Sequence, residues 1–182
     1  MRTITTRTAF AILFSMSLIQ AQAQSLETIR EQMIKDWERA KAYTIEYLNT
    51  MPADQYSFRA ADSIRNFAQQ MLHLASANVF LMMQAAEEAP PAGFSFTLES
   101  RTSAHQKDSV MHYVTAGYDY AIRAVKTVPV ANWFDKKKVF NRFEETKFAI
   151  MNKAFEHQTH HRGQTTIYIR EAGIRPPQER LF

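Results

Sequence analysis

Apolar residues recur at steps of three and four along most of this chain, which is the spacing of one face of an α-helix. The first such segment, residues 26–49, carries six of them on one face. They are Ile29, Met33, Trp37, Ala40, Tyr43 and Tyr47. Similar spacing predicts further helices at about residues 62–88, 103–128 and 142–171. Four long helices without a convincing strand predict an all-α protein, with a four-helix bundle as its natural architecture.

Prolines and glycines separate these segments. Pro52 follows the first predicted helix, Pro129 follows the third, and Gly173 is placed to end the fourth. The chain has only 4 Gly and 6 Pro in total, fewer turn signals than an all-β domain needs. Residues 93–102 are expected to form a polar loop. Residues 132–139, which contain three consecutive lysines, are expected to form a solvated linker.

The first 23 residues have the features of a signal peptide. Arg2 and Arg7 precede an apolar run at residues 9–19, and Ala21 and Ala23 match an A-x-A cleavage site. This run is much shorter than the roughly 20 residues that span a bilayer core, so a transmembrane anchor is the less favoured alternative. We therefore expect cleavage after Ala23, one domain at residues 24–182, and a periplasmic or secreted protein without stable membrane insertion.

Composition narrows the chemistry further. Apolar residues make up 46% of the chain and charged residues 22%, as in ordinary globular domains. The formal charge of +4 falls to +2 once Arg2 and Arg7 are removed, and the remaining basic residues are scattered, so we expect no nucleic-acid partner. The absence of cysteine excludes disulfides, cysteine zinc sites and thiol nucleophiles. Any metal site must then use His, Asp or Glu.

Three histidines lie close together on the fourth predicted helix: His157, His160 and His161. On a helix, His157 and His161 are roughly 40° apart around the axis and about 6 Å apart along it, so both imidazoles can reach one ion. His160 is about 100° from His161 and cannot easily join both on that ion. By itself this spacing is compatible either with a metal site or with two histidines that bind none.

The same helical face continues with polar residues. Gln164 and Tyr168 each lie within about 20° of His157 around the axis. Because buried polar groups cost free energy unless they are paired, this stripe is either exposed or lines a polar pocket.

A third histidine ligand could come from two other places. His73 stands in an otherwise apolar helical stretch, where a lone histidine is usually a core residue. His105 and His112 are seven residues apart and also share a helical face, but their neighbours are strongly polar. Spacing alone does not choose between them.

Two segments resemble a known family. They are HQTHHRGQTTIYIREAGIRPP at residues 157–177, and MPADQYSFRA followed by SIRNFAQQMLHLASANVF between residues 51 and 80. Together and in this order they resemble the DinB/YfiT-like family of metal-binding bundles. The resemblance implies an up-down-down-up four-helix bundle in which His73, His157 and His161 bind a divalent metal such as nickel or zinc. It also implies that the third helix contributes no ligand.

Three neutral imidazoles would leave coordination positions open, which is typical of a catalytic rather than a structural site. The family that this chain resembles includes thiol-dependent transferases and proteins described as metal-dependent hydrolases. The resemblance therefore implies one of these activities on a small substrate. Glu156 lies about 100° from His157 around the helix, and no carboxylate base can be named. A non-enzymatic metal-binding or stress-associated protein is the alternative. The sequence does not identify the substrate, and it is compatible with a homodimer.

Overall fold

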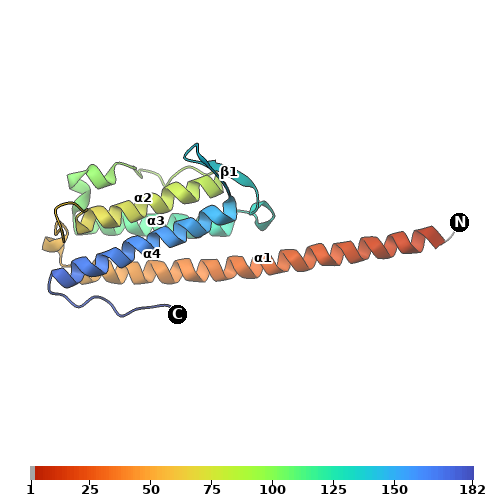
Figure 1. Ribbon diagram of the computed structural model, residues 1–182, viewed down its shortest axis with the longest axis horizontal. Coiled ribbons are helices and arrows are strands. Elements are labelled where there is room, and N and C mark those ends of the chain that lie inside the picture. Colours follow the sequence, from red (N-terminus) through yellow and green to blue (C-terminus); the bar gives the residue numbers. More distant parts are fainter. Residues whose placement is uncertain (1–2) are drawn as a thin grey trace.

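The computed structural model describes the backbone of residues 3–182 and the side chains of residue 20 and residues 22–182. Its four long helices are α1 (Thr3–Thr50), α2 (Phe67–Ala86), α3 (Lys107–Thr127) and α4 (Lys147–Glu171). Short 3-10 turns are η1 (Ala53–Gln55), η2 (Leu98–Ser100), η3 (Thr102–His105) and η4 (Val130–Asn132). The predicted all-α, four-helix architecture is confirmed (Figure 1).

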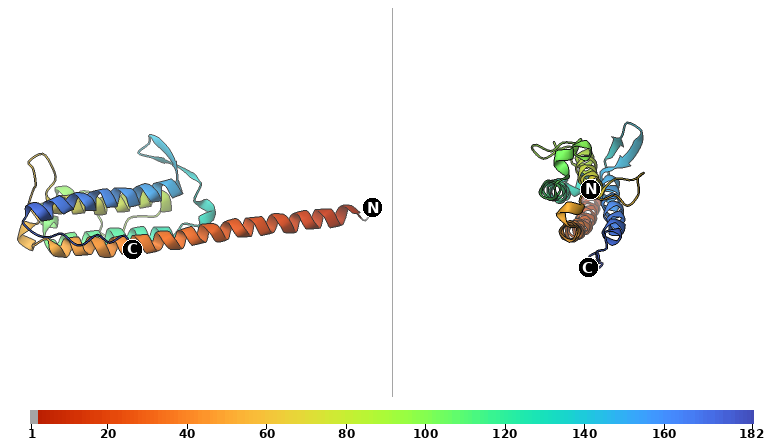
Figure 2. Two further views of the ribbon diagram at one scale, coloured as in Figure 1. Left: turned by 60° about the horizontal axis from the view of Figure 1, so that its bottom comes forward. Right: turned by 90° about the vertical axis from the view of Figure 1, so that its left-hand side faces the viewer.

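The helices run up, down, down and up, as the family resemblance implied (Figures 1 and 2). Lys107, at the start of α3, donates hydrogen bonds to the carbonyls of Asn49 and Met51 at the end of α1. Glu87, directly after α2, pairs with Lys147 at the start of α4 at 2.7 Å. The chain between α2 and α3 therefore returns along the length of the bundle, and α2 lies antiparallel to α4.

Helix α2 begins five residues later than the periodicity predicted, because a capping box fixes its start. The Asn66 side chain accepts a hydrogen bond from the Gln69 backbone at 2.8 Å, and the Gln69 side chain accepts one from the Asn66 backbone at 3.0 Å. This reciprocal pairing satisfies two backbone donors that a helix start leaves without partners. Residues 61–66 are consequently irregular, and they bring Arg65 beside the first turn of α2.

The stretch before α4 differs from its prediction. Residues 136–139 are not a linker but strand β1 (Lys136–Val139), which pairs antiparallel with β2 (Phe143–Thr146). Helix α4 therefore starts at Lys147 rather than near residue 142, with Thr146 as its N-cap. The expectation of no strand was wrong because the turn uses Phe140 and Asn141 at φ of 53° and 54°. Phe rarely adopts that conformation, and no Gly stands in this turn, so the sequence lacks the usual Asn-Gly or Asp-Gly signal of a hairpin.

The C-terminal end of α4 follows its prediction. Gly173 adopts φ of 76°, where a side chain would be strained. Its N–H donates to the Arg170 carbonyl at 2.9 Å, and the Ile174 N–H donates to the Ile169 carbonyl at 3.0 Å. These two bonds form a Schellman motif that satisfies the last carbonyls of the helix.

Helix α1 is much longer than predicted, and its first part extends past the rest of the bundle (Figures 1 and 2). The side chains of residues 1–19 and 21, which include the apolar run of the expected signal peptide, lie outside the described residues. Among the described helices, none is both long and apolar enough to cross a membrane. Cleavage after residue 23 stays a prediction.

Close packing between helices forms the core. The Trp37 ring packs in T-shaped arrangements with Tyr118 and Phe155, at centroid distances of 5.9 and 5.2 Å. A Cβ added at Gly117 of α3 would lie only 3.0 Å from the Ala75 carbonyl oxygen of α2. The absence of a side chain at residue 117 therefore lets α2 and α3 approach closely, which fixes the position of α2 relative to the other helices.

Candidate metal centre

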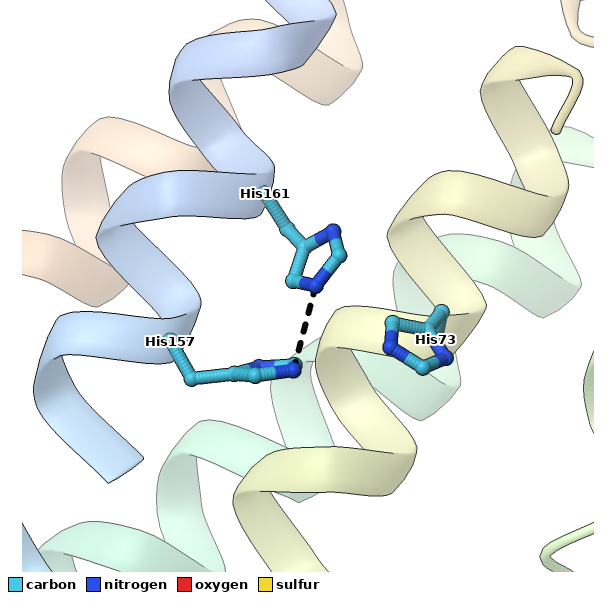
Figure 3. Close-up of side chains that lie close together, drawn as sticks. All are labelled: His73, His157 and His161. Carbon is cyan, nitrogen blue, oxygen red and sulfur yellow. Dashed lines mark hydrogen bonds between the residues drawn. The ribbon is translucent and has the colours of Figure 1, made fainter. Parts of the chain in front are cut away.

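Three histidines from two antiparallel helices meet in one place. His73 projects from α2, and His157 and His161 project from successive turns of α4 toward it (Figure 3). One ligand nitrogen from each can be chosen so that all three lie within 4.8 Å of one another. The structure thus brings together His157 and His161, which are four residues apart on α4, and the more distant His73 of α2.

The distances between the imidazole nitrogens suit coordination of one metal ion. The Nε2 atoms of His157 and His161 are 3.1 Å apart. Two nitrogens that each lie about 2.0–2.1 Å from one ion are separated by roughly 2.9–3.4 Å at octahedral or tetrahedral angles. The His73 ring centroid is 4.6 Å from that of His161 and 5.3 Å from that of His157. The three rings therefore surround one small volume.

A carboxylate orients the His73 ring. Glu99 of η2 lies with Oε2 3.1 Å from His73 Nδ1, and its Oε1 accepts a hydrogen bond from Arg65 Nε at 2.6 Å. A proton on Nδ1 can thus be donated to Glu99, which leaves the His73 Nε2 lone pair available. Metal-ligating histidines commonly make this kind of outer hydrogen bond to a carboxylate.

The side chains of Gln70 and Gln164 determine which ring nitrogen of His161 carries the proton. Gln70 Nε2 lies 2.8 Å from His161 Nδ1, and the same amide donates to Gln164 Oε1. In this orientation Nδ1 accepts, so the proton of neutral His161 sits on Nε2 and faces His157. Rotating both amides by 180° reverses the donors and places the proton on Nδ1. Binding of an ion by Nε2 of both motif histidines requires this second arrangement.

Burial keeps the three rings neutral. It lowers the pKa of His157 to about 4 and that of His161 to about 3, with further lowering by the neighbouring histidines and Arg65. Burial also lowers the pKa of His73, and Arg65 adds to this effect while Glu99 opposes it. At neutral pH the lone pairs are therefore available. The Nδ1 atom of His157 is buried and has no hydrogen-bond partner among the described residues.

A pocket of about 630 Å³ opens beside His161. Its polar lining residues are Ser63, Arg65, Gln70, His160, His161, Gln164 and Tyr168. Gln164 and Tyr168 of the polar stripe on α4 are among these lining residues. Gln164 and His160 are exposed there, whereas Tyr168 is buried and its hydroxyl donates to the Arg65 carbonyl at 2.6 Å.

The remaining histidines lie outside the group of three. His160 is next to His161, with ring centroids 5.0 Å apart, but faces the pocket. His105 lies with Nε2 3.0 Å from the Glu99 carbonyl oxygen, which helps hold η2 in place. His112 is exposed on α3, and Glu156 is exposed on α4.

A neighbouring face of α4, about 100° around the axis from His157 and His161, anchors this helix to the bundle. Arg162, directly after His161, is buried and donates to Gln158 Oε1 at 2.8 Å, while the Tyr118 hydroxyl donates to the same oxygen at 2.7 Å. The Arg162 guanidinium also lies 4.8 Å from the Tyr43 ring centroid. These contacts with α1 and α3 set the rotation of α4 and so direct its two histidines toward α2.

Sequence reasoning missed three residues that act on the histidines: Arg65, Gln70 and Glu99. Gln70 had a usable signal, since it lies three residues before His73 on the same helix. Glu99 had none, because the loop at residues 93–102 showed only polarity, and its contact with His73 spans 26 residues of sequence. The return of the chain along the bundle places it there.

Comparison with known proteins gives consistent results. The sequence model of the DinB family matches residues 22–180. A DinB-like protein from Bacillus cereus superimposes with a TM-score of 0.69 at 14% identity, covering 82% of this chain and 97% of the other. The DinB-like protein YjoA from Bacillus subtilis gives a TM-score of 0.62 at 19% identity, covering 83% and 96%. A search of curated proteins finds no match.

Proposed function

Since the chain belongs to the DinB family and gathers three histidines between α2 and α4, we propose that it binds one divalent metal ion and acts as a metal-dependent hydrolase or transferase on a small substrate. The observation that carries the metal site is the convergence of ligand nitrogens from His73, His157 and His161 within 4.8 Å. The hydrolase or transferase assignment is supported by the pocket that opens beside them.

The donor set suits a borderline ion. Imidazole nitrogens favour zinc, nickel, copper and iron over magnesium or calcium, and we propose zinc or nickel. When bound, such an ion supplies Lewis acidity that lowers the pKa of a coordinated water or thiol. Three neutral ligands leave its charge uncompensated and leave positions for a substrate.

The surrounding side chains have separate parts in this proposal. Glu99 holds the His73 ring and Gln70 holds the His161 ring, with Nδ1 of each imidazole donating the hydrogen bond in the metal-binding arrangement. His160 lines the pocket outside the proposed ligand set, so its imidazole can form a hydrogen bond with a bound substrate. Glu156 points to solvent, and Glu99 is engaged by His73, so neither is proposed as a general base.

Metal uptake is tested by zinc or nickel titration of the purified protein, with bound metal measured per chain. One ion per chain is expected, with loss in His73→Ala, His157→Ala and His161→Ala. His160→Ala is the matched control on the same helix and should retain the ion. Equal loss in His160→Ala, together with retention in His161→Ala, would show that the wrong pair was chosen.

Catalysis is tested with a screen of esters, amides, phosphate esters and thiol acceptors. Turnover should disappear with a chelator, return with added metal, and be absent in His161→Ala. The alternative is a non-enzymatic metal-binding protein, which is favoured by the lack of any Asp or Glu among the described residues that line the pocket. Metal binding without turnover across the screen would support it.

Export remains part of the proposal on sequence grounds alone. Low-molecular-weight thiols are abundant in the cytoplasm, and a periplasmic or secreted protein would meet little of them. Removal of the first 23 residues would therefore favour the hydrolase over the thiol-dependent transferase.

A further inference from the structure

A fixed positive charge stands beside the three histidines. Arg65 lines the pocket next to His161, and its charge contributes to the lowered pKa of all three imidazoles. Placing a guanidinium near a site for a divalent cation is electrostatically unfavourable, because like charges at short range repel. An arginine in this position therefore needs a negatively charged partner that offsets this repulsion.

Glu99 is such a partner, but it binds only part of the guanidinium. It accepts one hydrogen bond from Arg65, through Nε at 2.6 Å. Within the described part of the chain, the Nη1 and Nη2 groups of Arg65 have no hydrogen-bond partner, and the side chain is 38% exposed. Four N–H donors of the planar guanidinium are therefore available to a molecule in the pocket.

The charge balance of the pocket points the same way. Its described lining contains Arg65 and no acidic residue. With neutral imidazoles, a divalent ion and the offsetting charges of Arg65 and Glu99, the site carries a net charge of about +2 by formal count. A ligand bearing negative charge is the electrostatic complement, and the fork of a guanidinium matches carboxylate and phosphate oxygens.

We propose that the substrate of this site is a small oxyanion, carrying a carboxylate or phosphate group that pairs with Arg65 in the pocket beside the three histidines. This inference rests on the proposed metal-dependent function and adds the substrate class. Gln70, Gln164 and His160 supply further hydrogen-bonding groups around the same pocket. The volume of about 630 Å³ suits a small molecule.

The competing explanation is that Arg65 only holds Glu99 in place. The test uses cobalt-loaded protein, with cobalt content measured for every variant before any titration. Acetate, inorganic phosphate and the neutral acetamide are titrated while the visible absorption of cobalt is followed. Acetate and phosphate distinguish the two oxyanion classes, and acetamide is the uncharged counterpart of acetate.

We expect Arg65→Gln to weaken binding of acetate or phosphate by about ten- to a hundredfold, the range for a lost charge-assisted hydrogen bond. Acetamide binding should change less than twofold. Glu99→Gln keeps the guanidinium and should retain the anion preference when saturated with cobalt. Arg170→Gln, an exposed arginine that does not line this pocket, is the control for net charge.

Anion binding that is unchanged in cobalt-loaded Arg65→Gln, or equally weakened in Arg170→Gln, would overturn the inference. Wild-type protein that takes up cobalt without preferring either anion would overturn it and leave the metal proposal standing. Failure to take up cobalt would overturn both.

A second readout needs no variant and covers the case in which Arg65→Gln loses its cobalt. Phenylglyoxal modification of the wild-type cobalt protein is followed by peptide mass spectrometry. Acetate or phosphate should slow modification of Arg65 several-fold and leave Arg170 unaffected. Equal rates at Arg65 with and without these anions would refute the inference.

Discussion

Replacing Glu99 tests whether a residue that no motif revealed supports the metal centre. In Glu99→Ala, His73 loses its hydrogen-bond partner at Nδ1, 3.1 Å away, and Arg65 loses the charge that offsets it. The ring is then less well oriented, and an uncompensated cation faces the incoming ion. Both effects should weaken metal binding without removing a ligand.

The magnitude follows from two independent estimates. Losing an outer carboxylate typically lowers metal affinity by about 10–100-fold, and a hydrogen bond to a charged group contributes about 1.5–3 kcal/mol, or roughly 10–150-fold. The side chains of His73 and Glu99 are 28% and 32% exposed, so solvent screening favours the lower part of this range. We expect about a thirtyfold loss in Glu99→Ala and about tenfold in Glu99→Gln, which retains an acceptor oxygen.

The assay is competition between the protein and a chelator of known zinc affinity, at pH 7.5. Glu156→Gln is the matched control, because Glu156 is next to His157 in sequence but exposed on α4. It should stay within twofold of wild type. A Glu99→Ala protein with wild-type zinc affinity would refute the reasoning that this carboxylate orients His73. An equal loss in the Glu156 variant would attribute the effect to net charge.

Three further predictions concern the fold and the chain terminus. Gly117→Ala should destabilise the protein by about 1–3 kcal/mol, because its Cβ would lie 3.0 Å from the backbone of α2. Gly163→Ala, with nothing within 4 Å, should instead stabilise it by about 0.5–1 kcal/mol, and urea unfolding that shows the same sign for both would contradict this. The pKa values of His157 and His161 are lowered to about 4 and about 3, whereas the unfolded chain takes up these protons near pH 6.5. The stability of metal-free protein should therefore fall as the pH drops from 6.5 to 5, and unfolding curves that coincide across this interval would exclude that linkage. N-terminal sequencing of the protein made in a host with a secretion pathway should begin after Ala23, and an intact Met1 would argue against export.

The presence and order of the four helices were largely accessible from the sequence, because helical periodicity is a local property. The four apolar faces, the break at Pro52 and the C-terminal motif at Gly173 each depend on residues within a few turns of one another. The pairing of His157 with His161 is local in the same way, since two residues that are four positions apart on a helix share a face. Helix starts were less accurate: the capping box at Asn66 competes with the apolar pattern and shortens α2.

What the tertiary structure decided is which elements face each other. Whether His73 meets His157 and His161 depends on α2 lying antiparallel to α4. It also depends on the rotation of α4, which the contacts of Arg162 with Tyr43 of α1 and of Gln158 with Tyr118 of α3 set. The hairpin β1–β2 also needed tertiary contacts, since Phe140 stacks on Phe80 of α2 at 5.1 Å and helps hold an unfavourable turn. Glu99 reaches His73 only because the chain after α2 returns along the bundle. Contacts between residues that are distant in sequence produce no periodic pattern in the sequence. His157 and His161 could therefore be paired from their local spacing, whereas the contact of Glu99 with His73 could not be predicted.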